Sequence, residues 1–377
     1  MHWLWSLTVV SLHFRPMESE KDAARDNKLS SRAVVNFVSA AQANRHIAGL
    51  PVAARLVREI AEAGFTELWL VLPSGQDLDR TTREEVERLR GGLTIRSSNV
   101  PPTGAAVILA STELVPAAML RDPPARIEDS IIRLDRHDAS ARILKQTGKA
   151  SDGLVSRWLN RPMSRRISAV LLRFPMIRPV HVTWFNALLA LVMFAVVVFG
   201  GSTGLVIGAL LFQACSMLDG VDGEMARATF RSSDFGASLD SAVDMATNLL
   251  FFIGALINLW IGGSRGPVLF GVWGVVLIAI GSVIVARRGR GPSLSFDHVK
   301  RSYRTRFTGP VGSKLVRAGT FVTSRDFFCL LGVVVVLGGV PEAIPYIIGI
   351  LATGWMPFVL DLPARVAGWF SVKGGAR

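Results

Sequence analysis

The stretch that decides the fold runs from residue 219 to residue 244. It reads Asp219-Gly-Val-Asp222-Gly223-Glu-Met-Ala226-Arg227, then eight residues, then Gly236-Ala-Ser-Leu-Asp240-Ser-Ala-Val-Asp244. It lies between two apolar runs, 204–218 and 249–261. A carboxylate at the edge of a membrane span is costly to desolvate, so it indicates a functional site. Asp219 and Asp222 are three residues apart and Asp240 and Asp244 are four apart, so on helices each pair shares one face. The stretch therefore predicts two facing helix ends, each with two carboxylates.

These four carboxylates repel one another unless cations lie between them. A cage of carboxylate oxygens suits Mg²⁺ or Mn²⁺, and two such ions about 3.5–4 Å apart suit phosphoryl chemistry. Gly223, Ala226 and Gly236 keep the helix surfaces beside the acids small, which lets a ligand approach the backbone. Arg227 adds a planar fork of donors for a phosphate. The alternative is a structural acidic patch without a metal.

This stretch resembles the signature of the CDP-alcohol phosphotransferase family, D-x-x-D-G-x-x-A-R and then G-x-x-x-D-x-x-x-D, with every position filled. The resemblance implies transfer of a substituted phosphate from a CDP-linked alcohol to an acceptor alcohol, with release of CMP. It implies that Asp219, Asp222 and Asp240 hold one ion. Asp244 would complete a second ion site and remove the proton of the acceptor hydroxyl. It also implies a homodimer and a cytidine diphosphate pocket lined by Gly223, Ala226, Arg227 and Gly236.

Two further features of the family are matched in part. Its first span often opens with Pro-Asn-x-x-Thr, and here the phrase is Pro179-Val180-His-Val-Thr183, so Thr183 is a candidate for the nucleotide pocket although the asparagine is absent. In members with a phosphorylated acceptor, arginines at the ends of the fourth and fifth spans bind its phosphate. The candidates here are Arg287, Arg288 and Arg325. The alternative for each is positive-inside anchoring. Arg325 is favoured because a buried arginine needs a partner, which a phosphate supplies.

The composition excludes an ordinary soluble protein. Half of the 377 residues are apolar, and the mean hydropathy is positive, which points to several membrane spans. The net charge of +13 comes from basic residues beside apolar runs. That pattern fits an anionic lipid surface and phosphorylated substrates better than nucleic acid, so we expect no nucleic-acid partner. The two cysteines imply neither a disulfide framework nor a Cys/His metal site.

The hydropathy pattern predicts a membrane domain over 151–377 that is a bundle of six transmembrane helices. A basic amphipathic helix at 164–174 precedes them and is expected to lie on the lipid headgroups. Ten basic residues fall between the fourth and fifth spans, whereas the links on the other side hold only Arg265. The positive-inside rule therefore places both termini, the soluble domain and the metal site on the cytoplasmic side of a bacterial inner membrane. The predicted spans are 182–200, 204–222, 237–261, 267–286, 326–340 and 343–361.

The chain before the membrane domain is expected to hold a soluble α/β domain at 32–125 with a mainly parallel sheet. Residues 1–31 are expected to be disordered or to precede the true start at Met17, and 126–150 to be a polar linker. The soluble domain is similar to sugar-nucleotide nucleotidyltransferases. It lacks that family's glycine-rich loop and lysine at 39–45 and its metal-binding aspartate at 110–112, so we expect it to be inactive.

Three interpretations remain open from the sequence. The donor could be CDP-diacylglycerol, which would make the product a phospholipid. It could instead be a soluble CDP-polyol such as CDP-inositol, as in di-myo-inositol phosphate phosphate synthases. The phrase K-x-x-D-G-x-x-S-R-x-x-N-R at 149–161 is similar to the opening of that inositol-phosphate branch. The third interpretation is a membrane scaffold or transporter, which does not need clustered intramembrane aspartates. The acceptor is an alcohol or a polyol phosphate.

Overall fold

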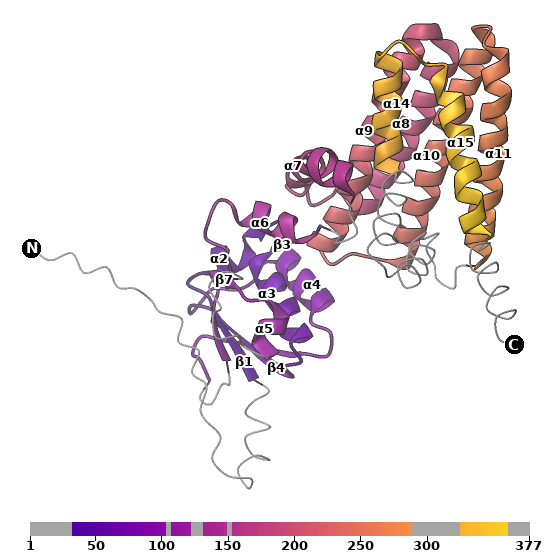
Figure 1. The fold of residues 1–377 in the computed structure, drawn as a ribbon. Coiled ribbons are helices and arrows are strands. Elements are labelled where there is room, and N and C mark those ends of the chain that lie inside the picture. The colour runs from indigo at the N-terminus through magenta and orange to yellow at the C-terminus, as the bar shows by residue number, and fades with distance from the viewer. Residues whose placement is uncertain (1–31, 103–106, 122–130, 149–152, 289–324, 361–377) are drawn as a thin grey trace, which may run out of the picture. The chain divides into compact units, whose positions relative to one another are not determined.

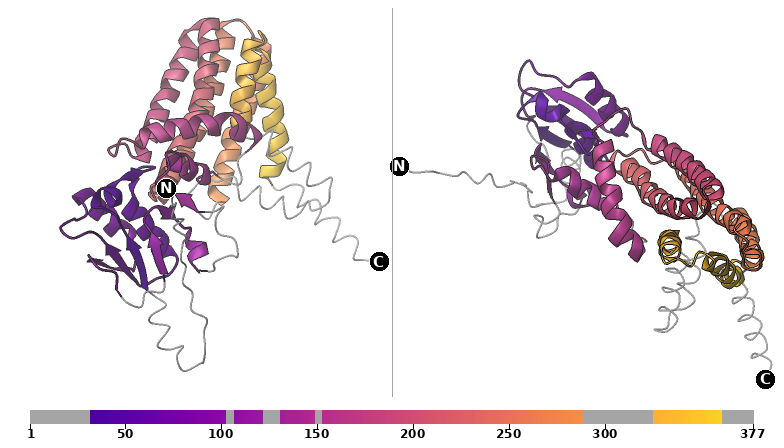
Figure 2. Two further views of the ribbon diagram at one scale, coloured as in Figure 1. Left: turned by 90° about the vertical axis from the view of Figure 1, so that its left-hand side faces the viewer. Right: turned by 90° about the horizontal axis from the view of Figure 1, so that it is seen from above.

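The computed structural model describes residues 32–102, 107–121, 131–148, 153–288 and 325–360. The expectation for residues 1–31 and most of the basic link between the fourth and fifth spans lie outside these ranges. The chain divides into two compact units (Figures 1 and 2). The first contains Met1–Thr147 with the short segments Leu172–Phe174 and Ala228–Phe230, and the second contains the rest.

The first unit is built on a four-stranded parallel sheet with strand order β5-β4-β1-β6. The strands are β1 (Arg32–Asn36), β4 (Glu67–Val71), β5 (Thr94–Ser98) and β6 (Val107–Ala110). Parallel neighbours need crossover connections, which here contain α3 (Val52–Glu62) and α4 (Arg80–Leu89). The sequence prediction of an α/β region with a parallel sheet is confirmed.

Short elements complete the first unit. They are α2 (Ala40–Asn44), β2 (His46–Ile47), β3 (Leu50–Pro51), β7 (Glu113–Leu114), α5 (Ala117–Arg121), β8 (Ile132–Arg133) and α6 (Ala139–Gln146). β8 and α6 fall inside the segment expected to be a linker. Ile132, Ile143 and Leu144 are buried, and β8 pairs with β7, so this segment packs as part of the unit rather than as a free connection.

Arg55 on α3 is a buried charge whose Nη2 donates hydrogen bonds to the main chain. Its Nη2 donates to the carbonyl oxygens of Ile47 and Ala48 at 3.0 and 3.2 Å. Burial lowers the pKa of Arg55 to about 10, and nearby Glu59 opposes that shift in part. The guanidinium therefore stays charged at neutral pH and ties α3 to the turn between β2 and β3.

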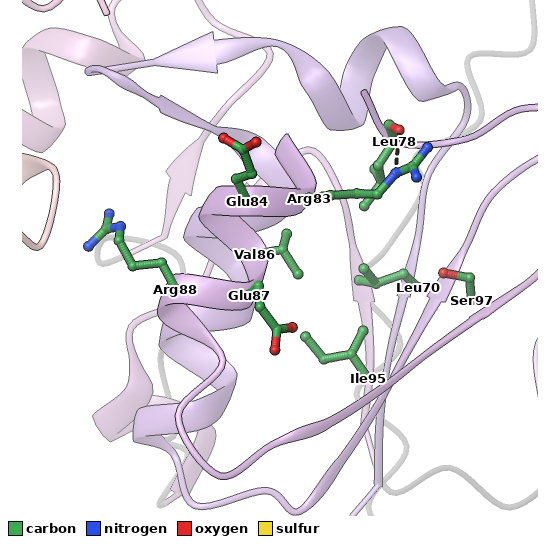
Figure 3. A pocket seen from close by; sticks show the side chains of 9 residues that line it. All are labelled: Leu70, Leu78, Arg83, Glu84, Val86, Glu87, Arg88, Ile95 and Ser97. Carbon is green, nitrogen blue, oxygen red and sulfur yellow. Dashed lines mark hydrogen bonds between the residues drawn. The ribbon is translucent and has the colours of Figure 1, made fainter. Parts of the chain in front are cut away.

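A hollow of about 700 Å³ lies on the first unit beside α4 and the edge of the sheet (Figure 3). Its charged side chains are already engaged. Arg83 donates to the carbonyl oxygen of Leu78 at 2.9 Å and pairs with Asp77, and Glu84 pairs with Arg80. The hollow therefore presents paired surface charges rather than convergent reactive groups.

The second unit is helical throughout its described residues. The π-helical turn η2 (Ser156–Asn160) leads into α7 (Arg161–Leu171), and six apolar helices run side by side after it (Figures 1 and 2). They are α8 (Pro179–Phe199), α9 (Gly201–Ala228), α10 (Asp234–Ile261), α11 (Arg265–Arg288), α14 (Arg325–Leu337) and α15 (Ala343–Val359). Each of the six predicted spans thus corresponds to a helix.

Four of these helices, α8 to α11, are long and apolar enough to cross a membrane, so the helical unit is that of a multi-pass membrane protein. α14 and α15 are shorter. The 13 residues of α14 span about 20 Å, against roughly 30 Å of hydrocarbon. The predicted fifth span, 326–340, is likewise shorter than the roughly 20 residues that a spanning helix needs.

The core of the helical unit is aromatic and aliphatic. Phe212 on α9 stacks on Phe251 of α10 with ring centroids 4.2 Å apart, and Met193 and Val197 of α8 are fully buried beside them. α11 and α15 pack so closely that a Cβ on Gly274 would lie 2.7 Å from the Cα of Gly349. The contacts of Phe212 and Phe251 with the buried side chains of α8 hold α8, α9 and α10 together.

Candidate active site

Three of the four predicted aspartates meet in space. Asp219 on α9 and Asp240 and Asp244 on α10 each place a carboxylate oxygen within 4.8 Å of those of the other two. All three side chains are half-buried. Residues 240 and 244 share a face of α10 because they are one turn apart, as the sequence predicted. Both helices continue past the acids, so the carboxylates project from helical turns rather than from helix ends.

Asp222 is more buried than the other acids, at 6% exposure, and it is not part of that group of three. Its carboxylate accepts a short hydrogen bond from the hydroxyl of Thr183 on α8. Thr183, which the sequence assigned to the nucleotide pocket, therefore lies against a predicted metal ligand. The bond joins α8 to α9 at the level of the acids.

Arg325, the first residue of α14, reaches into the acidic cluster. Its Nη1 lies 2.9 Å from Oδ1 of Asp219 and makes a short contact with Oδ1 of Asp244. Its side chain is 12% exposed. Among the described residues, Nε and Nη2 of Arg325 have no hydrogen-bond partner. The guanidinium thus offsets part of the acidic charge and keeps two donors for a further anion.

The other two candidate arginines lie at the end of α11. Arg287 is exposed, and Arg288 is the last residue of the helix. Arg325 is a candidate for the acceptor phosphate that the structure brings to the carboxylates.

The small residues of the signature have visible steric roles. A Cβ on Gly223 would lie 3.0 Å from Nη1 of Arg227, so glycine makes room for the guanidinium that folds back along α9. The amide of Gly236 donates to Oγ of Ser233 at 3.0 Å, which caps the start of α10. Ala226 is half-buried one residue before Arg227. These contacts shape the surface beside the acids.

Sequence reasoning missed a buried ion pair behind the signature. Glu224 is fully buried and accepts hydrogen bonds from Arg161 at 3.0 Å, Ser164 at 2.7 Å and Ser168 at 2.8 Å. All three donors lie on α7, which is thereby fixed to α9. The signal was present in the sequence, since a glutamate within a membrane-spanning run needs a partner, but the motif leaves position 224 unspecified.

The donor set allows a test of whether a metal fits. The three gathered groups are all carboxylates, which are hard oxygen ligands, and oxygen-only sites favour Mg²⁺ and Mn²⁺ over softer metals. Half-burial leaves the cluster open to a ligand on one side. The residues present therefore fit a divalent cation of that class.

Comparison with known proteins agrees with this geometry. Residues 176–351 match the model of the CDP-alcohol phosphatidyltransferase family. This part of the chain is similar to that family. All four aspartates, Thr183, Arg287, Arg288 and Arg325 lie within the matched range.

The chain is also similar to three curated proteins named bifunctional IPC transferase and DIPP synthase. It is 42% identical to that of Aquifex aeolicus over 29% of this chain and 24% of the relative. It is 31% identical to that of Archaeoglobus fulgidus over 40% of this chain and 29% of the relative. It is 38% identical to that of Thermococcus kodakarensis over 27% of this chain and 21% of the relative. The matched part thus spans about a quarter of the length of these relatives.

Proposed function

We propose that this protein is a CDP-alcohol phosphotransferase that transfers a substituted phosphate from a CDP-linked donor to an acceptor alcohol and releases CMP. The observation that carries the proposal is the convergence of Asp219, Asp240 and Asp244 from two helices within the family-matched region. A scaffold or transporter needs no such cluster, and burying it without a ligand is costly.

The roles proposed for the acids are those that the family resemblance implies. Asp219, Asp222 and Asp240 would hold one divalent ion, and Asp244 would complete the site of a second. Bound Mg²⁺ or Mn²⁺ would neutralise negative charge on the donor pyrophosphate as CMP leaves. Asp244 accepts the proton of the acceptor hydroxyl. Thr183 orients Asp222 through its hydroxyl. Gly223, Ala226, Arg227 and Gly236 line the cytidine diphosphate pocket.

The acceptor is an alcohol that carries a phosphate. Support comes from Arg325, whose Nε and Nη2 have no partner among the described residues although the side chain is nearly buried. An arginine fork binds a phosphate through parallel charge-assisted hydrogen bonds. Such a phosphate would lie beside Asp244, which would place the acceptor hydroxyl within reach of the base.

For the donor, we favour a soluble CDP-polyol such as CDP-inositol over CDP-diacylglycerol. The names of the three relatives support this choice, as does the inositol-type phrase at 149–161. The product would then be a phosphodiester of two polyols, and a phospholipid in the alternative. Because the first unit lacks the transferase residues, another enzyme would supply the CDP-polyol.

The proposed setting is the cytoplasmic face of a membrane, with α14 and α15 completing six spans and with the protein acting as a homodimer among membrane lipids. The excess of arginine and lysine between α11 and α14 supports this orientation. The test of orientation is labelling of an engineered surface cysteine from either side of sealed vesicles.

The experiment that tests the activity is a panel of CDP-diacylglycerol and CDP-inositol against polyol-phosphate acceptors, read as CMP release with Mg²⁺, with Mn²⁺ or with excess chelator. We expect release only with a divalent ion present. Asp240→Asn should abolish turnover while the protein still elutes as a folded species. The matched control is Asp234→Asn, which makes the same change at an exposed position of α10. Full activity in excess chelator contradicts the proposal.

A further inference from the structure

Asn160 and Asp326 are far apart in the sequence but belong to one hydrogen-bond network. Asn160 ends η2, and Asp326 is the second residue of α14. Nδ2 of Asn160 donates to Oδ1 of Asp326 at 2.8 Å and to Oγ of Ser216 at 3.0 Å. Ser216 on α9 donates to the same oxygen of Asp326 at 2.9 Å, and Nε2 of Gln213 donates to Oδ1 of Asn160 at 2.9 Å. Three separate segments therefore meet at Asn160.

The network admits one direction of donation. An ionised Asp326 can only accept, so the amide nitrogen of Asn160 must face it and the amide oxygen must face Gln213. Asn160, Ser216 and Gln213 are all at most 7% exposed, so water does not replace these bonds easily. Buried networks of this kind fix one arrangement of their elements because any shift leaves a polar group unpaired.

Two residues of this network are close in the sequence to residues of the acidic cluster. Asp326 follows Arg325, whose guanidinium contacts Asp219 and Asp244. Ser216 is one turn before Asp219 on α9. The carboxylate of Asp326 is therefore bonded to η2 and α9, while its neighbour Arg325 is directed at the cluster. The position of the start of α14 decides where that guanidinium lies.

We propose that Asn160 is a positioning residue: through Asp326 it fixes the start of α14 and so holds Arg325 beside Asp219 and Asp244. Its effect on substrate rests on the proposed function, in which Arg325 binds the acceptor phosphate. Asn160 ends a π-helical turn, a wider helical turn that is frequent at functional sites. The adjacent Arg161 bonds to Glu224 and thereby attaches the same segment to α9. Asn160 adds the link from that segment to α14.

The hydrogen bonds suggest a test in which the residue types at positions 160 and 326 are exchanged. Asn160→Asp turns a donor into a second carboxylate against Asp326 and should break the network. Adding Asp326→Asn restores a donor. In the exchanged pair, the bond between positions 160 and 326 and the bonds to Ser216 reverse their direction, whereas Gln213 still donates to position 160. The matched control is Asn258→Asp, because Asn258 is also a buried asparagine that donates two hydrogen bonds, to the carbonyl oxygens of Val197 and Gly201. If Asn160→Asp does not fold, Asn160→Ala takes its place.

The first readout does not depend on activity. The chain has two cysteines, both buried, and Cys329 is one turn after Asp326 on α14. Maleimide labelling of Cys329, assigned by peptide mass, reports how firmly the start of α14 is held. We expect labelling in Asn160→Asp to be about tenfold faster than in the wild type, as a hydrogen bond to a charged group is lost. The exchanged pair should label as slowly as the wild type, and so should Asn258→Asp.

The second readout compares the KM for the acceptor with the KM for the donor, both measured by CMP release. Asn160→Asp should raise the KM for a polyol-phosphate acceptor about tenfold, at little change in donor KM, because Arg325 is displaced. The exchanged pair should restore it. Cys329 labelling at the wild-type rate in Asn160→Asp, or in Asn160→Ala where it takes its place, overturns the proposal, and so does an equal change in Asn258→Asp. Faster Cys329 labelling in Asn160→Asp, together with a wild type that releases no CMP, would instead keep the positioning role and reject the proposed function.

Discussion

At the scale of single residues, Asp244 combines a place in the carboxylate cluster with a contact to Arg325, as does Asp219. A base for the acceptor hydroxyl must lie within hydrogen-bond reach of it. Asp244 meets that condition if Arg325 holds the acceptor phosphate, since the two side chains touch. The family resemblance assigns Asp219 to the first ion and the role of base to Asp244.

We therefore predict that Asp244→Asn retains donor binding and slows the chemical step by about 10²–10⁴-fold, the usual contribution of a general base. Asp219, Asp222 and Asp240 remain to hold the first ion. Donor affinity is measured by calorimetry, and CMP release in a single turnover. Asp234→Asn serves as the control. Loss of donor binding with an unchanged single-turnover rate at saturating donor would show that Asp244 is only a ligand.

A second residue-scale prediction concerns Thr183, whose hydroxyl donates to Asp222. Thr183→Val keeps the shape and removes the donor, so Asp222 loses its orientation. Partners of metal ligands typically contribute 10–100-fold to metal affinity, and we expect a loss of about that size in Mn²⁺ binding measured by calorimetry. The control is Thr247→Val, because Thr247 is equally buried but donates to the carbonyl oxygen of Val243 on its own helix. Equal Mn²⁺ affinity in both variants would leave Thr183 without a role at the site.

At the scale of elements, α11 and α15 depend on glycine for their close packing. A Cβ on Gly349 would lie 2.5 Å from Cε1 of Phe270 and 3.0 Å from its carbonyl oxygen, whereas one on Gly354 meets nothing within 4 Å. Gly349→Ala should therefore lower the thermal midpoint in detergent, by overpacking that costs about 1–3 kcal/mol. Gly354→Ala on the same helix should leave it unchanged or raise it, because alanine favours a helix. A common effect of both substitutions would rule out this steric explanation.

The elements also show what the sequence could predict. Hydropathy located all six apolar helices because long apolar runs have few alternatives in a membrane protein. It placed the end of the second span at residue 222, whereas α9 continues to Ala228, because the Asp- and Gly-containing stretch stays helical although its composition is polar. The four-residue spacing of Asp240 and Asp244 predicted that they share a face of one helix. Spacing could not predict that Arg325 contacts the cluster, because that contact joins residues about 80 positions apart.

At the scale of the whole molecule, the signature accounts for only part of the chain. The α/β class of the first unit and its mainly parallel sheet were predicted from the sequence. β8 and α6 were not predicted, because their short apolar segments are embedded in a polar stretch. The network around Glu224 and that around Asn160 were missed because hydrogen-bond partners distant in the sequence leave no local pattern.

The last prediction is that the first unit does not make the CDP-alcohol. After β1 the chain forms the short helix α2, and two amide donors at its start are already used: the amide of Val38 donates to Oε1 of Gln42, and that of Ala40 to Oε1 of Gln76. A triphosphate-binding loop instead leaves its amides directed at the ligand. Ser111, near the place of the expected metal-binding acid, donates to Gln42. With CTP and a polyol phosphate, the full chain should therefore release no pyrophosphate. The same preparation should release CMP from a CDP-alcohol donor, which controls for loss of folding. Steady pyrophosphate release that depends on the polyol phosphate would make the protein bifunctional.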